Sequence, residues 1–400
     1  MATNVQTLKG FRDIAPEEAL KRGRVVSLLK SVFKSYGFAP LETPTLEYAS
    51  VLEGKYGEEG EKLLYKFKDR GGRDAALRYD LTVPLARYIA QNKGKITFPF
   101  KRYQIGSVFR ADKPQAGRYR EFTQVDIDTV GTDTALADAE ILAVISSCLE
   151  ILGVKNFKIL VNDRNLFNDL PKKAVLILDK LDKIGEPAVI EGLNQAGFKG
   201  EEILKNARSQ KPTPRLEEIF TLLESFGISK ASFGFNPLLA RGLDYYTGMV
   251  YEAVVEGTTG SISGGGRYDN MIGIFGKEKI PAVGGSFGLD RLTDAVPKET
   301  LTEIPFRPQV LVTIFSRELL AQTIELFDQV QGTGLETELY LDPEAKLDKQ
   351  LKYADKKSVR YALILGPEEL RNNRVTIKDL QKRTQETLDK ESLFAILKKH

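Results

Sequence analysis

Residues 109–128 of the chain read FRADKPQAGRYREFTQVDID. Arginines and carboxylates surround a short segment that contains proline and glycine, which predicts a turn between two strands. From Thr123 onward apolar and polar residues alternate with period two, so Gln124, Asp126 and Asp128 are expected on one strand face. Buried polar groups need partners, so this face indicates a site for a charged substrate. A solvated hairpin with scattered ion pairs is the structural alternative.

Composition limits the classes of protein to consider. The 400 residues exceed the roughly 250 to 300 at which a single core stops growing, which predicts at least two domains. No apolar run approaches the roughly 18 residues of a membrane span, and Met1 to Lys9 lack the apolar core of a secretory signal. We therefore expect a cytoplasmic protein with no membrane segment. A net charge of +3 does not by itself indicate a nucleic-acid binder.

The scarcity of histidine and cysteine excludes several mechanisms. The only histidine is His400 and the only cysteine is Cys148. A Ser-His-Asp triad, a Cys-His dyad, a structural zinc site and a disulfide framework all need residues that this chain lacks. The remaining chemistry uses arginine, carboxylates, backbone groups or a hard metal such as magnesium, which is the repertoire of phosphate chemistry.

Periodicity and turn residues predict an N-terminal α+β region, a helical segment at about 162–230, a linker near 297–308 and a small βαβαβ unit after it. In the first region we expect helices at 16–36, 82–91 and 138–152, and strands at 77–80, 102–110, 121–128 and 249–256. In the last we expect strands at 310–315, 337–340 and 361–365, with helices at 317–330 and 346–357.

Several motifs, in order along the chain, resemble the histidyl-tRNA synthetases, which are class II aminoacyl-tRNA synthetases. Two of them are particular to the histidine enzymes, namely RGLDYYTG at 241–248 and GGGRYD at 264–269. The similarity covers nearly the whole chain and is weakest around 166–180, where the chain looks short for the family. The other similar segments are KGFRDIAP at 9–16, a first class II motif ending at Pro44, LRYDLTVP at 77–84, the arginine hairpin, a third class II motif GGSFGLDRL at 284–292, KYAD at 352–355 and YALILG at 361–366.

The resemblance implies a fold and a domain plan. Residues 1–305 would form an α+β class II catalytic domain, a mostly antiparallel sheet flanked by helices, with the helical insertion at about 162–230. Residues 306–400 would form an α/β anticodon-binding domain. The aspartate in RYDLT, where many bacterial members carry glutamate, is similar to the branch that includes eukaryotic enzymes.

The implied reaction joins the carboxylate of L-histidine to the α-phosphate of ATP and then moves the histidyl group to the 3′ end of tRNA(His). The first step needs no general base, because a carboxylate is already an anionic nucleophile. Catalysis reduces to holding two anions together and neutralising charge on phosphate, which suits the permanently charged fork of arginine. By the resemblance, Arg110 and Arg241 are catalytic, and Arg110, Arg118, Arg241 and Arg291 bind ATP.

The resemblance also implies a histidine pocket and partners. Asp80, Thr82 and Gln124 would bind the α-ammonium group, while Asp128, Tyr245 and Tyr246 would address the imidazole. A site that hydrogen-bonds both ring nitrogens leaves its own groups unpaired against an apolar side chain, which gives selectivity. Core packing is the alternative for the two tyrosines. The triphosphate implies Mg²⁺ with unassigned ligands, and the family implies a homodimer whose interface includes the first motif near Pro44.

Three alternatives remain open at this stage. One is a non-catalytic relative that serves as a regulatory subunit in histidine biosynthesis; the segment Val310–His400 and the retained substrate residues oppose it. A second is a class II synthetase for another amino acid, against which RGLDYY argues. A third is a module that senses tRNA without forming an adenylate, which the intact arginine set disfavours.

Overall fold

The computed structural model describes residues 5–56, 60–113, 119–240, 245–258, 260–276, 278–301 and 308–398. The chain divides into two compact units, residues 1–301 and residues 302–400, and each is described by itself. In the described ranges no helix is both long enough and apolar enough to cross a membrane.

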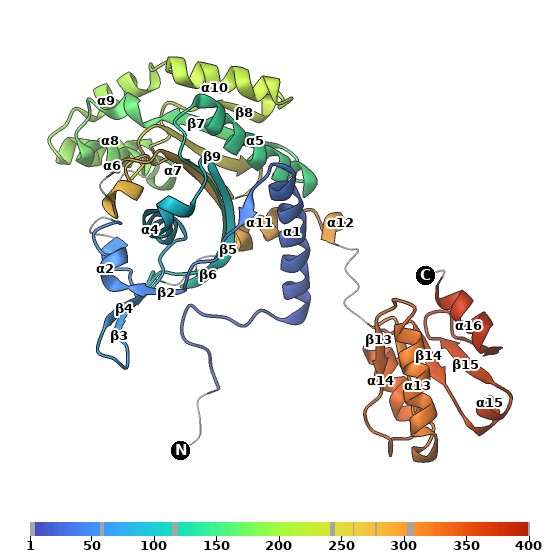
Figure 1. The fold of residues 1–400 in the computed structure, drawn as a ribbon. Coiled ribbons are helices and arrows are strands. Elements are labelled where there is room, and N and C mark those ends of the chain that lie inside the picture. The colour runs from blue at the N-terminus through green and yellow to red at the C-terminus, as the bar shows by residue number, and fades with distance from the viewer. Residues whose placement is uncertain are drawn as a thin grey trace. The chain divides into compact units, whose positions relative to one another are not determined.

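The first unit is built on an eight-stranded sheet with the order β1-β5-β6-β11-β10-β9-β7-β8 (Figure 1). Adjacent strands are antiparallel except at the two edges, where β1 pairs with β5 and β7 with β8 in parallel. The expected fold class is therefore confirmed. The strands are β1 (Ala39–Pro40), β5 (Phe100–Phe109), β6 (Glu121–Val130), β7 (Phe157–Asp163), β8 (Phe233–Phe235), β9 (Met249–Val255), β10 (Ser263–Arg267) and β11 (Ala282–Gly288).

Helices cover both faces of this sheet. Helix α1 buries Val25, Leu29 and Phe33, a four-residue spacing that places all three on one helix face against the main core. Figure 1 shows α1 along one side of the sheet and α4 along the other, where a second core cluster lies. These helices are α1 (Pro16–Ser35), α2 (Ala49–Leu52), α4 (Thr82–Asn92), η1 (Lys93–Lys95), α5 (Ala135–Ile151), η4 (Ile272–Ile274), α11 (Leu289–Ala295) and α12 (Lys298–Leu301).

The predicted hairpin is formed by β5 and β6, whose register determines what faces the polar residues of β6. Arg102 lies opposite Asp128, Gln104 opposite Asp126, and Gly106 opposite Gln124. The period-two pattern is confirmed, because Gln124, Asp126 and Asp128 share one face of an interior strand.

One sequence expectation needs correction, and two strands were not expected. The strand predicted at 77–80 is instead β4 (Asp74–Leu77), which joins β2 (Leu46–Tyr48) and β3 (Lys66–Lys68) in a small sheet of order β2-β4-β3. The chain leaves this sheet at Arg78 and turns into α4 because the Asp80 carboxylate accepts the Val83 backbone N–H at 3.0 Å. The glycines at 264–266 and 284–285, where no strand was expected, belong to β10 and β11 in the middle of the large sheet.

The helical insertion is present and has a core of its own. Val175, Leu178, Val189 and Leu193 pack together within it. Its last helix packs on α5, which joins the insertion to the large sheet. The elements are η2 (Arg164–Phe167), α6 (Lys172–Leu178), α7 (Leu181–Ile184), α8 (Glu186–Gln195), α9 (Gly200–Arg208), α10 (Pro214–Ser225) and η3 (Lys230–Ser232).

The second unit has a five-stranded sheet of order β13-β12-β14-β15-β16. The first three strands are parallel and form the predicted βαβαβ unit, while β15 and β16 add an antiparallel extension that the sequence analysis missed. The elements are β12 (Val310–Val312), η5 (Arg317–Leu319), α13 (Leu320–Gln331), β13 (Thr337–Leu339), α14 (Leu347–Lys356), β14 (Tyr361–Ile364), α15 (Pro367–Arg371), β15 (Arg374–Asp379), β16 (Thr384–Asp389) and α16 (Lys390–Leu397).

Candidate active site

The polar face of β6 presents acceptor oxygens that the described part of the chain leaves without a hydrogen bond. They are Gln124 Oε1, Asp126 Oδ1 and Asp128 Oδ2, all shielded from solvent. An unmade hydrogen bond at a buried polar atom costs about 1 to 3 kcal/mol, so such atoms in a native fold need a reason. Three on one strand face form a surface suited to a ligand rich in N–H donors.

A buried arginine balances the two carboxylates of this face. Arg102 is fully buried, and its Nη2 lies 2.8 Å from Asp128 Oδ2 and 4.0 Å from Asp126 Oδ2. The same Nη2 donates to the Leu81 backbone carbonyl at 3.2 Å. The contact with Asp128 is an ion pair without good hydrogen-bond geometry, which leaves that oxygen able to accept from a ligand.

Asp128 is also tied to the aromatic residues of the two histidine-specific motifs. The Tyr268 hydroxyl donates a hydrogen bond to Asp128 Oδ1. The Tyr268 ring packs edge-on against Tyr245 at 6.3 Å between centroids, and Tyr245 lies 4.5 Å from Tyr246. The Tyr245 hydroxyl donates to that of Tyr246 at 3.3 Å. Asp128 and these tyrosines therefore form one continuous cluster.

Glycines make this close packing sterically feasible. A Cβ atom on Gly284 would lie 1.9 Å from Asp128 Oδ1, and one on Gly266 would lie 3.1 Å from the Tyr246 ring and 2.4 Å from the Met249 carbonyl oxygen. Any side chain at these strand positions would displace the site residues or the neighbouring strand.

Asp80 lies beside α4 and has partners of its own. Besides capping Val83, its Oδ1 accepts a hydrogen bond from the Tyr56 hydroxyl at 3.1 Å. Thr82 is the first residue of α4, so the loop from Asp80 to Thr82 places both next to the helix N-terminus. Burial raises the pKa of Asp80, and this rise is opposed by the hydrogen bond from the Val83 backbone N–H and by the nearby charge of Arg110.

Arg110 follows the last residue of β5 and is held between two aromatic rings. Its guanidinium carbon lies 4.3 Å from the Tyr79 ring centroid and 5.0 Å from that of Phe122. Its Nε donates to the Tyr79 carbonyl at 3.2 Å. Since Tyr79 packs on Tyr56 at 4.4 Å, an unbroken set of contacts joins Arg110 to Asp80. The rings restrict the guanidinium without neutralising its charge.

The remaining predicted arginines are placed differently. Arg291 is exposed on α11 and donates to the Ser261 carbonyl at 3.3 Å, away from the contacts that join Arg110 to Asp80. Arg118 and Arg241 lie outside the described residues. The structure thus brings together Arg110, Asp80, Thr82, Gln124, Asp128, Tyr245 and Tyr246 in one region of the first unit.

The sequence analysis missed Arg102, and it gave no role to Asp126 or Tyr268, although it placed Asp126 on the polar face of its strand. The signal for Arg102 was available, because Arg102 and Gln104 alternate with apolar residues just as Asp126 and Asp128 do. Tyr268 was quoted within GGGRYD without a role, and only the pairing of β10 with β11 and β6 brings it to Asp128.

Burial and mutual repulsion perturb the carboxylates of β6. Burial raises the pKa of Asp126 to about 7, with Asp128 and Asp80 adding to the rise while Arg102 and the Ser286 hydroxyl oppose it. Burial also raises the pKa of Asp128, opposed by Arg102 and the Tyr268 hydroxyl. Asp126 therefore keeps its proton to higher pH than an ordinary aspartate does.

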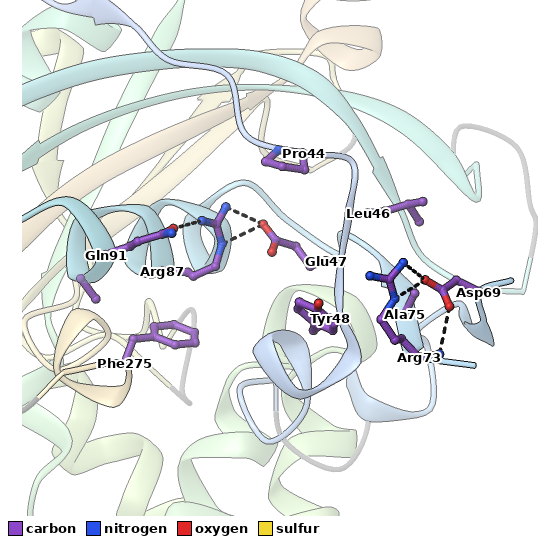
Figure 2. A pocket seen from close by; sticks show the side chains of 11 residues that line it. Pro44, Leu46, Glu47, Tyr48, Asp69, Arg73, Ala75, Arg87, Gln91 and Phe275 are labelled. Carbon is purple, nitrogen blue, oxygen red and sulfur yellow. Dashed lines mark hydrogen bonds and ion pairs between the residues drawn. The ribbon is translucent and has the colours of Figure 1, made fainter. Parts of the chain in front are cut away.

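A separate hollow lies near the small sheet (Figure 2). It has a volume of about 650 Å³ and is lined by Pro44, Leu46, Tyr48 and Phe275, among others. Arg87 reaches across it to the carboxylate of Glu47 at 2.8 Å. Pro44 is the residue that the sequence analysis expected near a subunit interface. Across the described residues no cluster of three or more acidic, histidine or cysteine side chains could hold a metal.

The raised pKa of Asp126 predicts a pH-dependent stability difference. Between pH 4 and 7 the folded state retains a proton that the unfolded state has released, so Asp126 lowers the stability as the pH rises through this window. Asp126→Asn mimics the protonated form. The difference in free energy of unfolding, Asp126→Asn minus the unmodified chain, should therefore increase by about 2 to 3 kcal/mol between pH 5 and pH 8.

Urea denaturation at pH 5, 6.5 and 8 measures this difference. Asp74→Asn, at an exposed strand position, is the matched control and should show no such trend. A difference for Asp126→Asn that stays constant from pH 5 to pH 8 would contradict the assigned titration.

Comparison with known proteins adds an independent observation. A family model described as histidyl-tRNA synthetase matches residues 10–184 and 178–292, and a model described as an anticodon binding domain matches residues 309–400. A histidine–tRNA ligase of Nanoarchaeum equitans is 40% identical over 97% of this chain and 98% of its own length. That of Wolinella succinogenes is 39% identical, over 94% of each chain.

Solved structures agree with these relatives. The histidyl-tRNA synthetase of Nostoc sp. PCC 7120 covers 100% of both chains with a TM-score of 0.82 and 31% identity. A Bacillus halodurans structure, described as an ATP phosphoribosyltransferase regulatory subunit/histidyl-tRNA synthetase, has a TM-score of 0.73 over 88% of this chain and 97% of its own; at 23% identity it shows the fold alone. The chain belongs to the histidyl-tRNA synthetase family.

Proposed function

We propose that this chain activates L-histidine with ATP to histidyl-adenylate and transfers the histidyl group to the 3′ end of tRNA(His). The observation that carries the proposal is the row of buried acceptors Gln124 Oε1, Asp126 Oδ1 and Asp128 Oδ2, which make no hydrogen bond within the described part of the chain. Histidine brings an ammonium group and a ring N–H to such a surface, and both are donors. The curated relatives named histidine–tRNA ligases support the activity and do not favour a regulatory subunit.

The amino-acid pocket follows from the chemistry of each group. Gln124, Asp80 and Thr82 take the α-ammonium group, supported by the acceptor capacity of Gln124 Oε1 and the carboxylate of Asp80. Asp128 accepts the imidazole N–H through Oδ2, which makes no hydrogen bond within the described residues, and Arg102 opposes the rise that burial causes in the pKa of this carboxyl. Tyr246, with Tyr245, offers a hydroxyl donor to the other ring nitrogen. An apolar side chain in this pocket would leave both partners unpaired.

Arginines hold the phosphates in this proposal. Arg110 contacts the α-phosphate and the histidine carboxylate, and its position between two aromatic rings supports this role because it leaves the charge available. Arg291 contacts the outer phosphates from its exposed position on α11. Arg118 and Arg241 are proposed for the outer phosphates and the α-phosphate, respectively, on the family resemblance alone. Mg²⁺ arrives bound to ATP, and its protein ligands stay unassigned.

Attack of a histidine carboxylate oxygen on the α-phosphorus breaks the bond to the β-phosphate oxygen and releases pyrophosphate. The cations stabilise the charge that develops on the phosphate oxygens. In the second step a ribose hydroxyl of the tRNA attacks the acyl carbon, and AMP leaves. A phosphate oxygen of the adenylate takes the ribose proton, since the described site residues include no histidine base.

The domain plan and assembly are proposals as well. Residues 1–305 carry the catalytic reactions, with the insertion at about 162–230, and residues 306–400 contact the anticodon. We place the enzyme in the cytoplasm, where tRNA is used for translation. The homodimer is supported by apolar side chains that remain exposed on the small sheet, namely Leu46, Tyr48 and Phe67.

The direct test is histidine-dependent exchange of labelled pyrophosphate into ATP, without tRNA and against a panel of the other amino acids. Exchange with histidine alone, followed by charging of tRNA(His), is the expected result because the pocket discriminates through paired polar groups. Absence of exchange from a well-folded protein would refute the proposal in favour of a regulatory or tRNA-sensing role. Exchange with a different amino acid would contradict the assignment of these residues to a histidine pocket.

Asp128→Asn tests the imidazole contact. Loss of a charged acceptor should raise the KM for histidine roughly 10- to 100-fold in pyrophosphate exchange while the KM for ATP stays nearly unchanged. Asp74→Asn serves as the surface control. Equal losses for histidine and ATP would point to a folding defect rather than to recognition.

A charge on the small sheet tests the homodimer. Leu46 lines the hollow in Figure 2 with half of its surface exposed, so Leu46→Glu would bury a carboxylate if two copies meet there. Sedimentation velocity should show a shift from dimer to monomer for Leu46→Glu. The similarly exposed Ile184→Glu in the insertion should not change the distribution. An unmodified chain that sediments as a monomer would exclude the homodimer.

A further inference from the structure

The segment at residues 8–12, which we call the N-terminal strap, lies against the loop end of the β5–β6 hairpin. The Arg120 backbone N–H donates to the Gly10 carbonyl at 2.8 Å, and the Arg110 backbone N–H donates to the Arg120 carbonyl at 2.9 Å. Gly10 has φ +89°, a conformation that other residues rarely adopt. A continuous row of backbone hydrogen bonds thus runs from the strap to Arg110.

Side chains strengthen the same junction. Arg120 reaches back to the strap, where its Nη1 donates to the Lys9 carbonyl at 3.2 Å, and its Nε donates to the Asp112 carbonyl at 3.0 Å. The Arg12 guanidinium carbon lies 3.7 Å from the centroid of the Tyr119 ring, close enough for a cation–π contact. Both residues that follow the hairpin tip are therefore held by the strap.

One carboxylate joins the strap to the start of α11. Asp290 Oδ1 accepts from both Arg12 and Arg22, and only 18% of the Asp290 side chain is exposed. Arg22 also donates to Thr123 Oγ1 of β6 at 2.8 Å. Asp290 immediately precedes Arg291, the residue proposed for the outer phosphates. The cluster therefore connects the strap, α1, the hairpin and the beginning of α11.

We infer that the N-terminal strap positions the ATP-binding arginines: it holds the loop end of the hairpin beside Arg110 and, through Arg12 and Asp290, the helix start beside Arg291. Arg12 and Asp290 are positioning residues, since each acts through a neighbouring segment. This inference rests on the proposed function of Arg110 and Arg291 in binding ATP. The strap has no proposed role in histidine recognition, because its described contacts are with the loop end of the hairpin, with Tyr65 and with the start of α11.

The physical expectation is a selective loss. Asp290 keeps Arg22 as its partner when Arg12 is lost, so Arg12→Ala leaves no unpaired charge and should leave folding nearly intact. Positioning is more sensitive, because small displacements of charged groups from a phosphate weaken binding and catalysis strongly. The strap variants should therefore affect ATP much more than they affect either stability or histidine.

Pyrophosphate exchange by the full chain tests this inference. Arg12→Ala should raise the KM for ATP about five- to tenfold while the KM for histidine stays within about twofold. Asp290→Asn should do the same, and the double variant should be less impaired than the product of the two single effects, because both remove one contact. Gly10→Ala strains the backbone without changing charge and should also raise the KM for ATP.

Arg12→Lys keeps the charge, so its affinity for ATP should be higher than that of Arg12→Ala. The matched control is Arg24→Ala, which removes an exposed arginine of α1 and should change neither KM. The melting temperature of each variant separates positioning from unfolding. If the unmodified enzyme is active and Arg12→Ala leaves its KM for ATP unchanged, the inference is overturned. If the variant loses affinity for ATP and for histidine equally, the inference is also overturned. If the unmodified enzyme itself is inactive, the result contradicts the proposed function instead.

Discussion

A single buried positive charge makes the polar face of β6 compatible with folding. Arg102 lies opposite Asp128 in the β5–β6 register and is shared with Asp126. Burying an ion without a partner is strongly unfavourable, and removing one member of a buried pair typically costs about 3 to 5 kcal/mol. Without Arg102 the two carboxylates would face each other in the interior. The register of one hairpin therefore determines whether the site can exist.

The same site departs from what stability alone would select. Three buried acceptors lack hydrogen bonds in the described part of the chain, and Asp126 has a pKa near 7. A fold optimised for stability would pair those oxygens or replace them with apolar groups. Retaining them is reasonable when a ligand supplies the missing donors, since each contact is then made only with the correct substrate bound.

Much of the fold could be predicted from local patterns. The helix at Pro16–Ser35, the period-two strand Glu121–Val130 and the C-terminal βαβαβ unit follow from apolar spacing, which reflects burial of one face. The glycine-rich strands β10 and β11 were missed, because glycine has a low strand propensity. Glycine is needed there because Asp128 and Tyr246 occupy the space that a side chain would fill. Both of those residues come from other segments of the chain, so the local sequence does not reveal the requirement.

The candidate site, too, was predictable in its local patterns but not in the contacts between distant segments. Gln124 and Asp128 could be placed on one face from their alternation, and the resemblance supplied Asp80, Arg110 and the two tyrosines. Their assembly into one cluster depends on pairings between segments more than a hundred residues apart, such as Tyr268 with Asp128. Arg102 was missed for a related reason. An arginine in a strand is ordinarily exposed, and only the strand register shows that its charge has two partners.

Charge balance around Arg102 distinguishes the two carboxylates in function. One guanidinium neutralises one carboxylate fully, and Asp128, at 2.8 Å, is nearer to it than Asp126, at 4.0 Å. Arg102 therefore opposes the burial-induced rise in the pKa of Asp128 at closer range, while burial raises the pKa of Asp126 to about 7. A carboxylate can only accept hydrogen bonds, whereas tyrosine hydroxyls can donate. A neutral imidazole presents one N–H and one bare nitrogen, so a single carboxylate beside a hydroxyl is its complement, and the site needs no histidine of its own to recognise one.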